Sequence, residues 1–88
     1  MSQVEGKQVT IRSVMHKRHF IIGYNDAVSG KPFNDDYDKY DPNQQWNYER
    51  GRLYAIATDG AIPPKNGKNV SYHAINTFGK LVGEGVIV

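Results

Sequence analysis

Residues 46–57 read WNYERGRLYAIA, and this stretch decides the fold because its spacing is typical of a helix with apolar residues on two sides. The segment before it, Asp41-Pro42-Asn43-Gln44, offers a carboxylate for the free N–H groups of a first turn, a proline at the first helical position and a glutamine three residues after the cap. Asp59-Gly60 supplies a stop, because glycine accepts the left-handed conformation that closes a helix. We therefore predict a helix over residues 42–59.

The two apolar sides of this helix predict two neighbours. Gly51 and Ala55 lie four residues apart and share a side with Tyr48, so a neighbouring backbone can approach closely there. The opposite side comprises Trp46, Leu53, Ile56 and Ala57.

A weak internal repeat, the internal echo, indicates which segment packs against the Gly51 side of this helix. Phe20-x-x-Gly23-x-x-x-Ala27 has the same spacing as Tyr48-x-x-Gly51-x-x-x-Ala55. We predict a first helix over residues 13–30, capped by Ser13 and stopped by Gly30, that packs antiparallel to the second helix. The connection between them is an acidic loop, residues 31–41.

The C-terminal third predicts one more helix, over residues 71–83. Asn69 or Ser71 caps it, and its apolar stripe is expected to dock on the Trp46 side of the second helix. A short strand pair between Val9–Ile11 and Val86–Val88 is left open. The remaining segments are an N-terminal arm (1–12), a connector rich in Gly, Pro and Lys (60–70) and a tail (84–88). The expected fold is a mainly α, small single domain of three helices.

Composition bounds the cellular context. The chain has 88 residues and no cysteine, which excludes disulfides and thiolate metal sites and favours a reducing cytoplasm. It has no long apolar run and no apolar core of a secretory signal, so we expect a protein that is neither exported nor membrane-spanning. Because so small a core can gain stability by self-association, a homodimer stays open.

Charge is separated along the chain. The net charge is +2, yet residues 34–41 hold four Asp and one Lys, a local charge of −3, which leaves +5 (10 basic minus 5 acidic) for the rest. Aromatic residues are enriched at protein interfaces, and two tyrosines alternate with these acids. The predicted partner-binding residues are Asp35, Asp36, Tyr37, Asp38 and Tyr40.

Basic residues give the alternative reading. Arg50 lies one turn from Trp46 and can stack on its ring, whereas Glu49 and Arg52 are spaced to pair with one another. Arg50 and Arg52 can instead reach a phosphate or a carboxylate on a partner, where the guanidinium fork gives paired bonds. The predicted RNA-binding residues are Arg12, Lys17, Arg18, Lys31, Arg50 and Arg52.

The sequence offers few candidate residues for a metal site or for catalysis. His16 and His19 have a spacing that puts two ligands on adjoining helical turns, but a zinc site needs further ligands, so a solvated basic helix end is the default. The acidic loop lacks the glycine and glutamate of a calcium loop. No complete set of catalytic residues can be assembled, and we expect no metal, no cofactor and no enzymatic activity.

The segment GYNDAVSG, followed by the Lys31-Pro32-Phe33 turn and W-x-Y-E-R-G-R-x-Y-A, resembles the ribosome modulation factor family. Gly23, Tyr24 and Gly30 match the family's first-helix spacing, and Gly51 with Ala55 match its second helix. The resemblance implies a pair of helices, binding to small-subunit ribosomal RNA and the formation of inactive ribosome dimers.

The string YERGR with the preceding Pro-Phe turn is also similar to uncharacterised small proteins of bacteriophages and proteobacterial genomes. This similarity implies an accessory protein of a phage or prophage. We therefore expect a non-enzymatic binding protein that modulates a bacterial host protein in the cytoplasm, with a ribosome- or RNA-binding modulator as the alternative.

Overall fold

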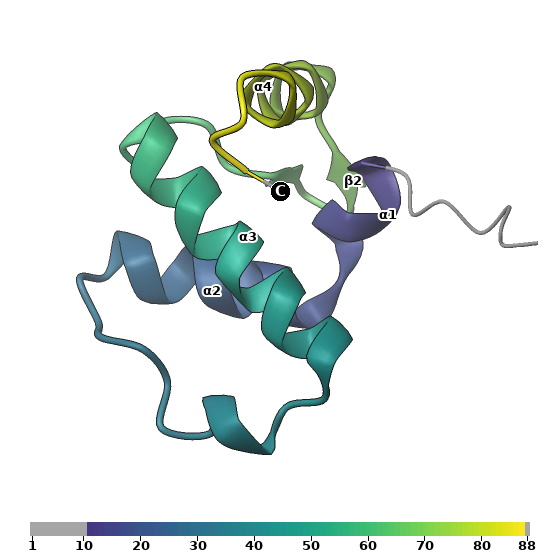
Figure 1. Cartoon of the computed structure of the whole chain (residues 1–88). Coiled ribbons are helices and arrows are strands. Elements are labelled where there is room, and N and C mark those ends of the chain that lie inside the picture. Colours follow the sequence, from purple (N-terminus) through teal and green to yellow (C-terminus); the bar gives the residue numbers. More distant parts are fainter. Residues whose placement is uncertain (1–10, 88) are drawn as a thin grey trace, which may run out of the picture.

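The computed structural model describes residues 11–87. Figure 1 shows helices arranged around a central crossing, with a small antiparallel two-stranded sheet beside them. The mainly helical, small single domain expected from the sequence is confirmed. In chain order the elements are α1 (Ile11–His16), α2 (Arg18–Val28), the short 3-10 helix η1 (Tyr37–Lys39), α3 (Pro42–Thr58), β1 (Lys65–Asn66), β2 (Asn69–Val70) and α4 (Tyr72–Gly83).

The start and the end of α3 agree with the sequence prediction. The Gln44 N–H donates to Asp41 Oδ1 at 2.9 Å, and the Asp41 N–H donates to Gln44 Oε1 at 3.0 Å, which completes a capping box. At the other end Asp59 and Gly60 both adopt positive φ, 56° and 69°, and the Gly60 N–H donates to the Ala55 carbonyl at 3.0 Å. These caps fix the length of the helix.

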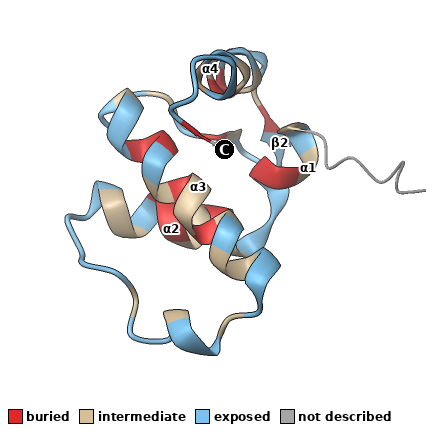
Figure 2. Ribbon diagram, viewed as in Figure 1, coloured by how far each residue is buried: buried red, intermediate tan, exposed pale blue. Residues whose placement is uncertain are grey.

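The glycines of the internal echo form the contact between α2 and α3. A methyl group built on Gly51 would lie 2.9 Å from the Tyr24 nitrogen, and one built on Gly23 would lie 3.0 Å from the Tyr48 carbonyl carbon. Since ordinary carbon contacts are about 3.5–4.0 Å, neither position accepts a side chain. The two backbones therefore touch, and Figure 2 shows buried residues where the helices cross.

The predicted antiparallel direction of this pair is wrong, because like ends of α2 and α3 lie together. Near the ends of both helices the Tyr24 hydroxyl donates to the Gly60 carbonyl at 3.2 Å, and near their starts the rings of His19 and Tyr40 lie 4.5 Å apart. The connection, residues 29–41, is long enough to carry the chain back to the starting end, as Figure 1 shows. A glycine contact sets how closely two helices pack, but it leaves their relative direction open.

The predicted helix over residues 13–30 is divided at Lys17, which has an extended backbone with φ −67° and ψ 140°. Met15 before the break and Phe20 after it are both completely buried. The change of direction lets both side chains enter one core. Ser13 is inside α1 rather than at its cap, since α1 already includes Ile11.

The third predicted helix is present as α4, with Ser71 as its cap: its hydroxyl accepts from the Ala74 N–H at 3.1 Å. Its docking site differs from the prediction. The Phe78 ring lies 5.6 Å from the Phe20 ring and 5.9 Å from the Tyr54 ring, so α4 packs beside the glycine crossing and not on the Trp46 side. The side of α3 that was expected to receive it is exposed at Trp46 (48%), Leu53 (37%) and Ile56 (63%).

The short sheet lies in the predicted connector instead of joining the termini. Lys65 pairs with Val70 and Asn66 with Asn69. The proposed strand at Val9–Ile11 is wrong at Ile11, which is helical, while Val9 is outside the described residues. Neither Val86 nor Ile87 is in a strand. Ile87 is instead buried in the core. Burial removes more of its apolar surface from water than a place in an exposed terminal strand would.

Within residues 11–87, no helix combines the length and apolar character needed to cross a membrane.

Candidate partner-binding surface

The acidic loop is held against α3 by its tyrosine rings. The rings of Tyr37 and Tyr40 lie 5.9 Å and 5.8 Å from the ring of Tyr48, which is completely buried. The Tyr37 hydroxyl also donates to the Glu49 carboxylate. Aromatic pairs at such distances favour tilted and edge-on arrangements, which these rings adopt. Tyr37 and Tyr40 are thus the anchors of the loop.

Polar contacts reinforce this anchoring. The Tyr48 hydroxyl donates to Asp26 of α2 at 2.7 Å and accepts from the Asn34 N–H of the loop at 2.9 Å. The side-chain amide of Gln45 donates to the Tyr37 carbonyl at 3.1 Å. One buried tyrosine therefore ties both crossing helices to the loop between them.

These contacts raise two tyrosine pKa values. The hydrogen bond to Glu49, followed by burial and nearby carboxylates, raises the pKa of Tyr37 to about 12. Burial and the hydrogen bond to Asp26 raise the pKa of Tyr48. Both hydroxyls therefore stay protonated at neutral pH and act as donors to carboxylates.

The aspartates of the loop face outward. Asp35, Asp36 and Asp38 are exposed, and Lys39 lies 3.5 Å from Asp36 in an exposed ion pair that contributes little stability. The five predicted partner-binding residues thus divide into three accessible carboxylates and two half-buried tyrosines. The carboxylates are available to a partner, and the tyrosines position them.

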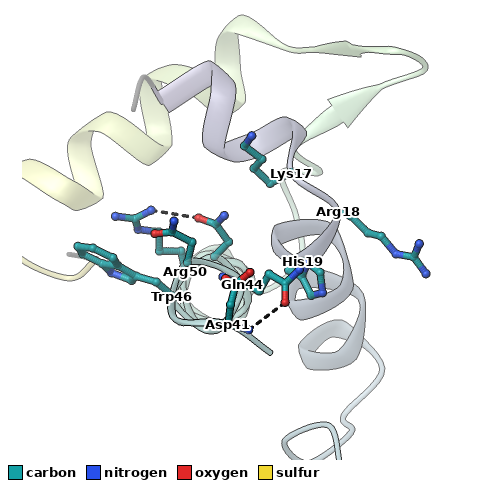
Figure 3. A pocket seen from close by; sticks show the side chains of 9 residues that line it. Lys17, Arg18, His19, Asp41, Gln44, Trp46 and Arg50 are labelled. Atoms are coloured by element: carbon teal, nitrogen blue, oxygen red, sulfur yellow. Dashed lines mark hydrogen bonds between the residues drawn. The ribbon is translucent and has the colours of Figure 1, made fainter. Parts of the chain in front are cut away.

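A second feature lies beside the loop, between the start of α2 and the start of α3. It is a surface hollow of about 500 Å³, hereafter the α2–α3 hollow (Figure 3). Three cationic side chains and one carboxylate are among its lining residues. They are Lys17, Arg18, His19, Asp41, Asn43, Gln44, Trp46, Asn47 and Arg50.

Trp46 and Arg50 form one wall of the hollow. The Arg50 guanidinium carbon lies 4.1 Å from the centre of the Trp46 ring, which confirms the predicted stacking. Arg50 Nη1 also donates to Asn47 Oδ1 at 3.1 Å. Burial lowers the pKa of Arg50, since a partly desolvated guanidinium loses favourable hydration.

The residues predicted to bind RNA do not share one surface. Lys17, Arg18 and Arg50 line the α2–α3 hollow, whereas Arg12 is exposed on α1. Lys31 lines a different, shallower hollow together with three aspartates, Asp26, Asp35 and Asp36.

Arg52 and Glu49, the predicted ion pair, both take part in holding the loop. Arg52 donates to the Pro32 carbonyl at 3.5 Å and lies over the Phe33 ring, 5.0 Å from its centre. Glu49 accepts the Tyr37 hydroxyl. Each side chain therefore reaches across to the loop from the same turn of α3.

The sequence analysis singled out residues on both sides of the α2–α3 hollow, but it did not predict that the two sides lie next to each other. In the predicted antiparallel pair, residues 16–19 (HKRH) and residues 46–50 (WNYER) would lie at opposite ends. Because α2 and α3 run with like ends together, both segments lie at the same end. Because the helix is broken at Lys17, α2 begins at Arg18, and both of these residues line the hollow.

Neither His16 nor His19 belongs to a metal-binding cluster: within the described part of the chain, no three His, Asp or Glu side chains gather in a way that could hold an ion. His19 packs against Tyr40 and lines the α2–α3 hollow. His16 is exposed at the end of α1.

Comparison with known protein families, with curated protein sequences and with solved structures finds no match for this chain. The fold and the surface define a class only: a mainly helical single domain with a close glycine crossing and a charged surface at one end of it. The similarities to ribosome modulation factors and to small phage proteins therefore rest on the residue patterns alone.

Proposed function

We propose that this chain is a non-enzymatic binding protein that modulates a bacterial host protein through a protein–protein interface centred on the acidic loop. The observation that carries the proposal is the anchoring of the loop by Tyr37 and Tyr40 on Tyr48. An interface segment that is already ordered loses less conformational entropy when a partner binds. The exposed carboxylates of Asp35, Asp36 and Asp38 then meet a basic surface of the partner.

The distribution of charge favours a protein partner over RNA. Strong RNA binding relies on several cations that contact phosphates together. Here Lys31 lies among aspartates, Arg52 is engaged with the loop, and Arg12 lies on a different helix from the α2–α3 hollow. The acidic loop next to the hollow repels a polyanion that extends past it.

The cellular setting of the proposal comes from the residue pattern. The similarity of YERGR to small phage and proteobacterial proteins supports a phage or prophage accessory protein that acts in the host cytoplasm. The absence of cysteine from the chain fits a reducing compartment.

The proposal is tested by affinity capture from bacterial lysate with quantitative mass spectrometry. The wild-type chain is compared with Asp35→Asn/Asp36→Asn/Asp38→Asn, and Lys65→Gln/Lys68→Gln in the β1–β2 hairpin is the control. We expect one host protein to be enriched by wild type and control and lost by about tenfold or more in the loop variant, since its rim charges are removed. Equal retention by the loop variant contradicts the proposal.

An RNA- or ribosome-binding modulator is the second candidate, because Lys17 and Arg50 lie with the exposed Trp46 ring in one hollow. Aromatic rings with neighbouring cations bind single-stranded RNA by stacking and phosphate contact. This candidate predicts capture of ribosomes that is abolished by ribonuclease and falls steeply with salt. Capture that survives ribonuclease removes it.

A further inference from the structure

We infer that the α2–α3 hollow binds an acidic peptide segment of the partner protein, with a carboxylate facing Lys17 and Arg50 and an adjacent apolar side chain against Trp46. The inference deepens the proposed function, on which it rests, by giving the partner a second contact beside the acidic loop.

Charge complementarity is the first argument. Three cations line the hollow against one carboxylate, Asp41. That carboxylate accepts the Gln44 N–H at 2.9 Å as part of the α3 cap, so it is committed to the helix. Figure 3 shows Arg18 pointing away from Trp46, whereas the Arg50 guanidinium carbon lies 4.1 Å from the centre of the Trp46 ring. The hollow is therefore electropositive on the side where the aromatic wall stands.

The aromatic wall is the second argument. Trp46 is 48% exposed, and Leu53, two turns further along the same stripe of α3, is 37% exposed. Tryptophan and arginine are among the residue types that are enriched at positions dominating the binding energy of protein interfaces. A ligand with only a carboxylate would not contact the Trp46 ring. A peptide with an acidic residue next to an apolar one would contact both the cations and the ring.

The preorganisation of Arg50 is the third argument. Its guanidinium is positioned by the Trp46 ring and by the Asn47 side chain. A guanidinium presents five N–H donors in a planar fork whose geometry matches that of a carboxylate. Burial lowers the pKa of Arg50, and a cation that has lost hydration gains more from an added anion.

The border between hollow and loop distinguishes a peptide from a nucleic acid. Asp41 lies in both features, and residues 34–41 carry a local charge of −3 from four Asp and one Lys. A nucleic acid that extends from the hollow on this side would bring its phosphates close to the acidic loop, and repulsion between these negative charges is unfavourable. A peptide can change sign along its length, with an acidic and apolar part in the hollow and a basic residue beside Asp36 or Asp38.

The chain carries a convenient reporter, because Trp46 is its only tryptophan. The probe is a synthetic peptide in which aspartate, leucine and glutamate precede two lysines. It is titrated into the full chain while Trp46 fluorescence is recorded. The matched probes are the same peptide with asparagine and glutamine in place of the acids, and a short oligouridine. We expect saturable binding of the acidic peptide and binding about tenfold weaker for the amide peptide and for the oligouridine.

The variants are Lys17→Gln, Arg50→Lys and the control Lys68→Gln. Lys17 and Lys68 are both exposed, so these changes leave the fold intact, and circular dichroism verifies it for Arg50→Lys. Weaker peptide binding in Lys17→Gln and Arg50→Lys, with Lys68→Gln unchanged, supports the inference. No saturable change, equal binding of the amide peptide, tighter binding of the oligouridine, or insensitivity to Lys17→Gln overturns it. If these results are negative while the loop variant still loses its host protein, the hollow inference alone fails.

Discussion

The backbone of Gly51 in α3 rests directly on the backbone of Phe20 in α2. A methyl group on Gly51 would lie 2.9 Å from the Phe20 carbonyl carbon, and closer still to its oxygen. Oxygen and carbon atoms of two main chains cannot move apart without separating the helices. The crossing therefore depends on glycine at this position.

Gly51→Ala is expected to destabilise the domain by about 3 kcal/mol, since overpacking against rigid backbone costs on the order of 1–3 kcal/mol and sometimes more. Gly83→Ala at the end of α4 is the matched control, because nothing lies within 4 Å of its added methyl group. That control should be neutral or slightly stabilising. Urea unfolding monitored by circular dichroism measures both variants, and equal midpoints would refute the close crossing.

Tyr54 provides a prediction of the opposite sign. Its ring is completely buried, and among the described residues its hydroxyl has no hydrogen-bond partner. Because an unsatisfied buried polar group costs about 1–3 kcal/mol, Tyr54→Phe should raise the free energy of unfolding. Tyr24→Phe is the comparison, since the Tyr24 hydroxyl donates to the Gly60 carbonyl at 3.2 Å, and its loss should destabilise by about 1 kcal/mol. A destabilised Tyr54→Phe would show that its hydroxyl has a partner.

The capping box of α3 can be tested through Asp41. Asp41→Ala removes the acceptor of the Gln44 N–H and should cost about 1 kcal/mol, within the range of about 0.5–2 kcal/mol for such caps. Asp41→Asn keeps an acceptor oxygen and should change stability little. Thermal unfolding compares the three proteins. An alanine variant as stable as wild type would show that α3 does not depend on this cap.

Alkaline pH should loosen the acidic loop. The folded pKa of Tyr37, about 12, is above its ordinary value of 10.0, so the protonated hydroxyl is favoured by folding. Its contribution to stability is present in full below pH 10 and is lost as pH rises through about 12. Solvent screens this half-buried group, so the effect on stability is modest.

Spectrophotometric titration follows all six tyrosines together, so the pKa of Tyr37 is measured as the difference between the titration curves of wild type and Glu49→Gln. Glu49→Gln removes the charged acceptor that is the largest cause of the shift, so the pKa of Tyr37 should fall toward 10.0. Glu84→Gln at the end of α4 is the control with the same charge change. An unchanged titration curve in Glu49→Gln would contradict the hydrogen bond between Tyr37 and Glu49.

Local signals made α3 predictable. Asp41, Pro42 and Gln44 define its start, Asp59 and Gly60 its end, and the spacing of Gly51 and Ala55 its closely packed side. These features depend on residues near one another in the chain, where backbone chemistry determines the conformation.

Features set by long-range packing were not predictable in the same way. Nothing in HKRH marks a break at Lys17, which follows from burying Met15 and Phe20 together. The direction of α2 relative to α3 depends on the path of residues 29–41. The α2–α3 hollow results from the break at Lys17 and from the direction of α2. Its residues could therefore be singled out in the sequence, but their proximity could not be predicted.

The most direct test of the glycine crossing is a nuclear Overhauser spectrum of the isotopically labelled chain. The backbone contact predicts cross-peaks between the Gly51 α-protons and the Tyr24 amide proton at the crossing. The arrangement of like ends predicts cross-peaks between the Val28 methyls and the Gly60 α-protons. The absence of the first set would contradict the backbone contact. Contacts from Val28 to the start of α3 instead would contradict the arrangement of like ends on which the α2–α3 hollow depends.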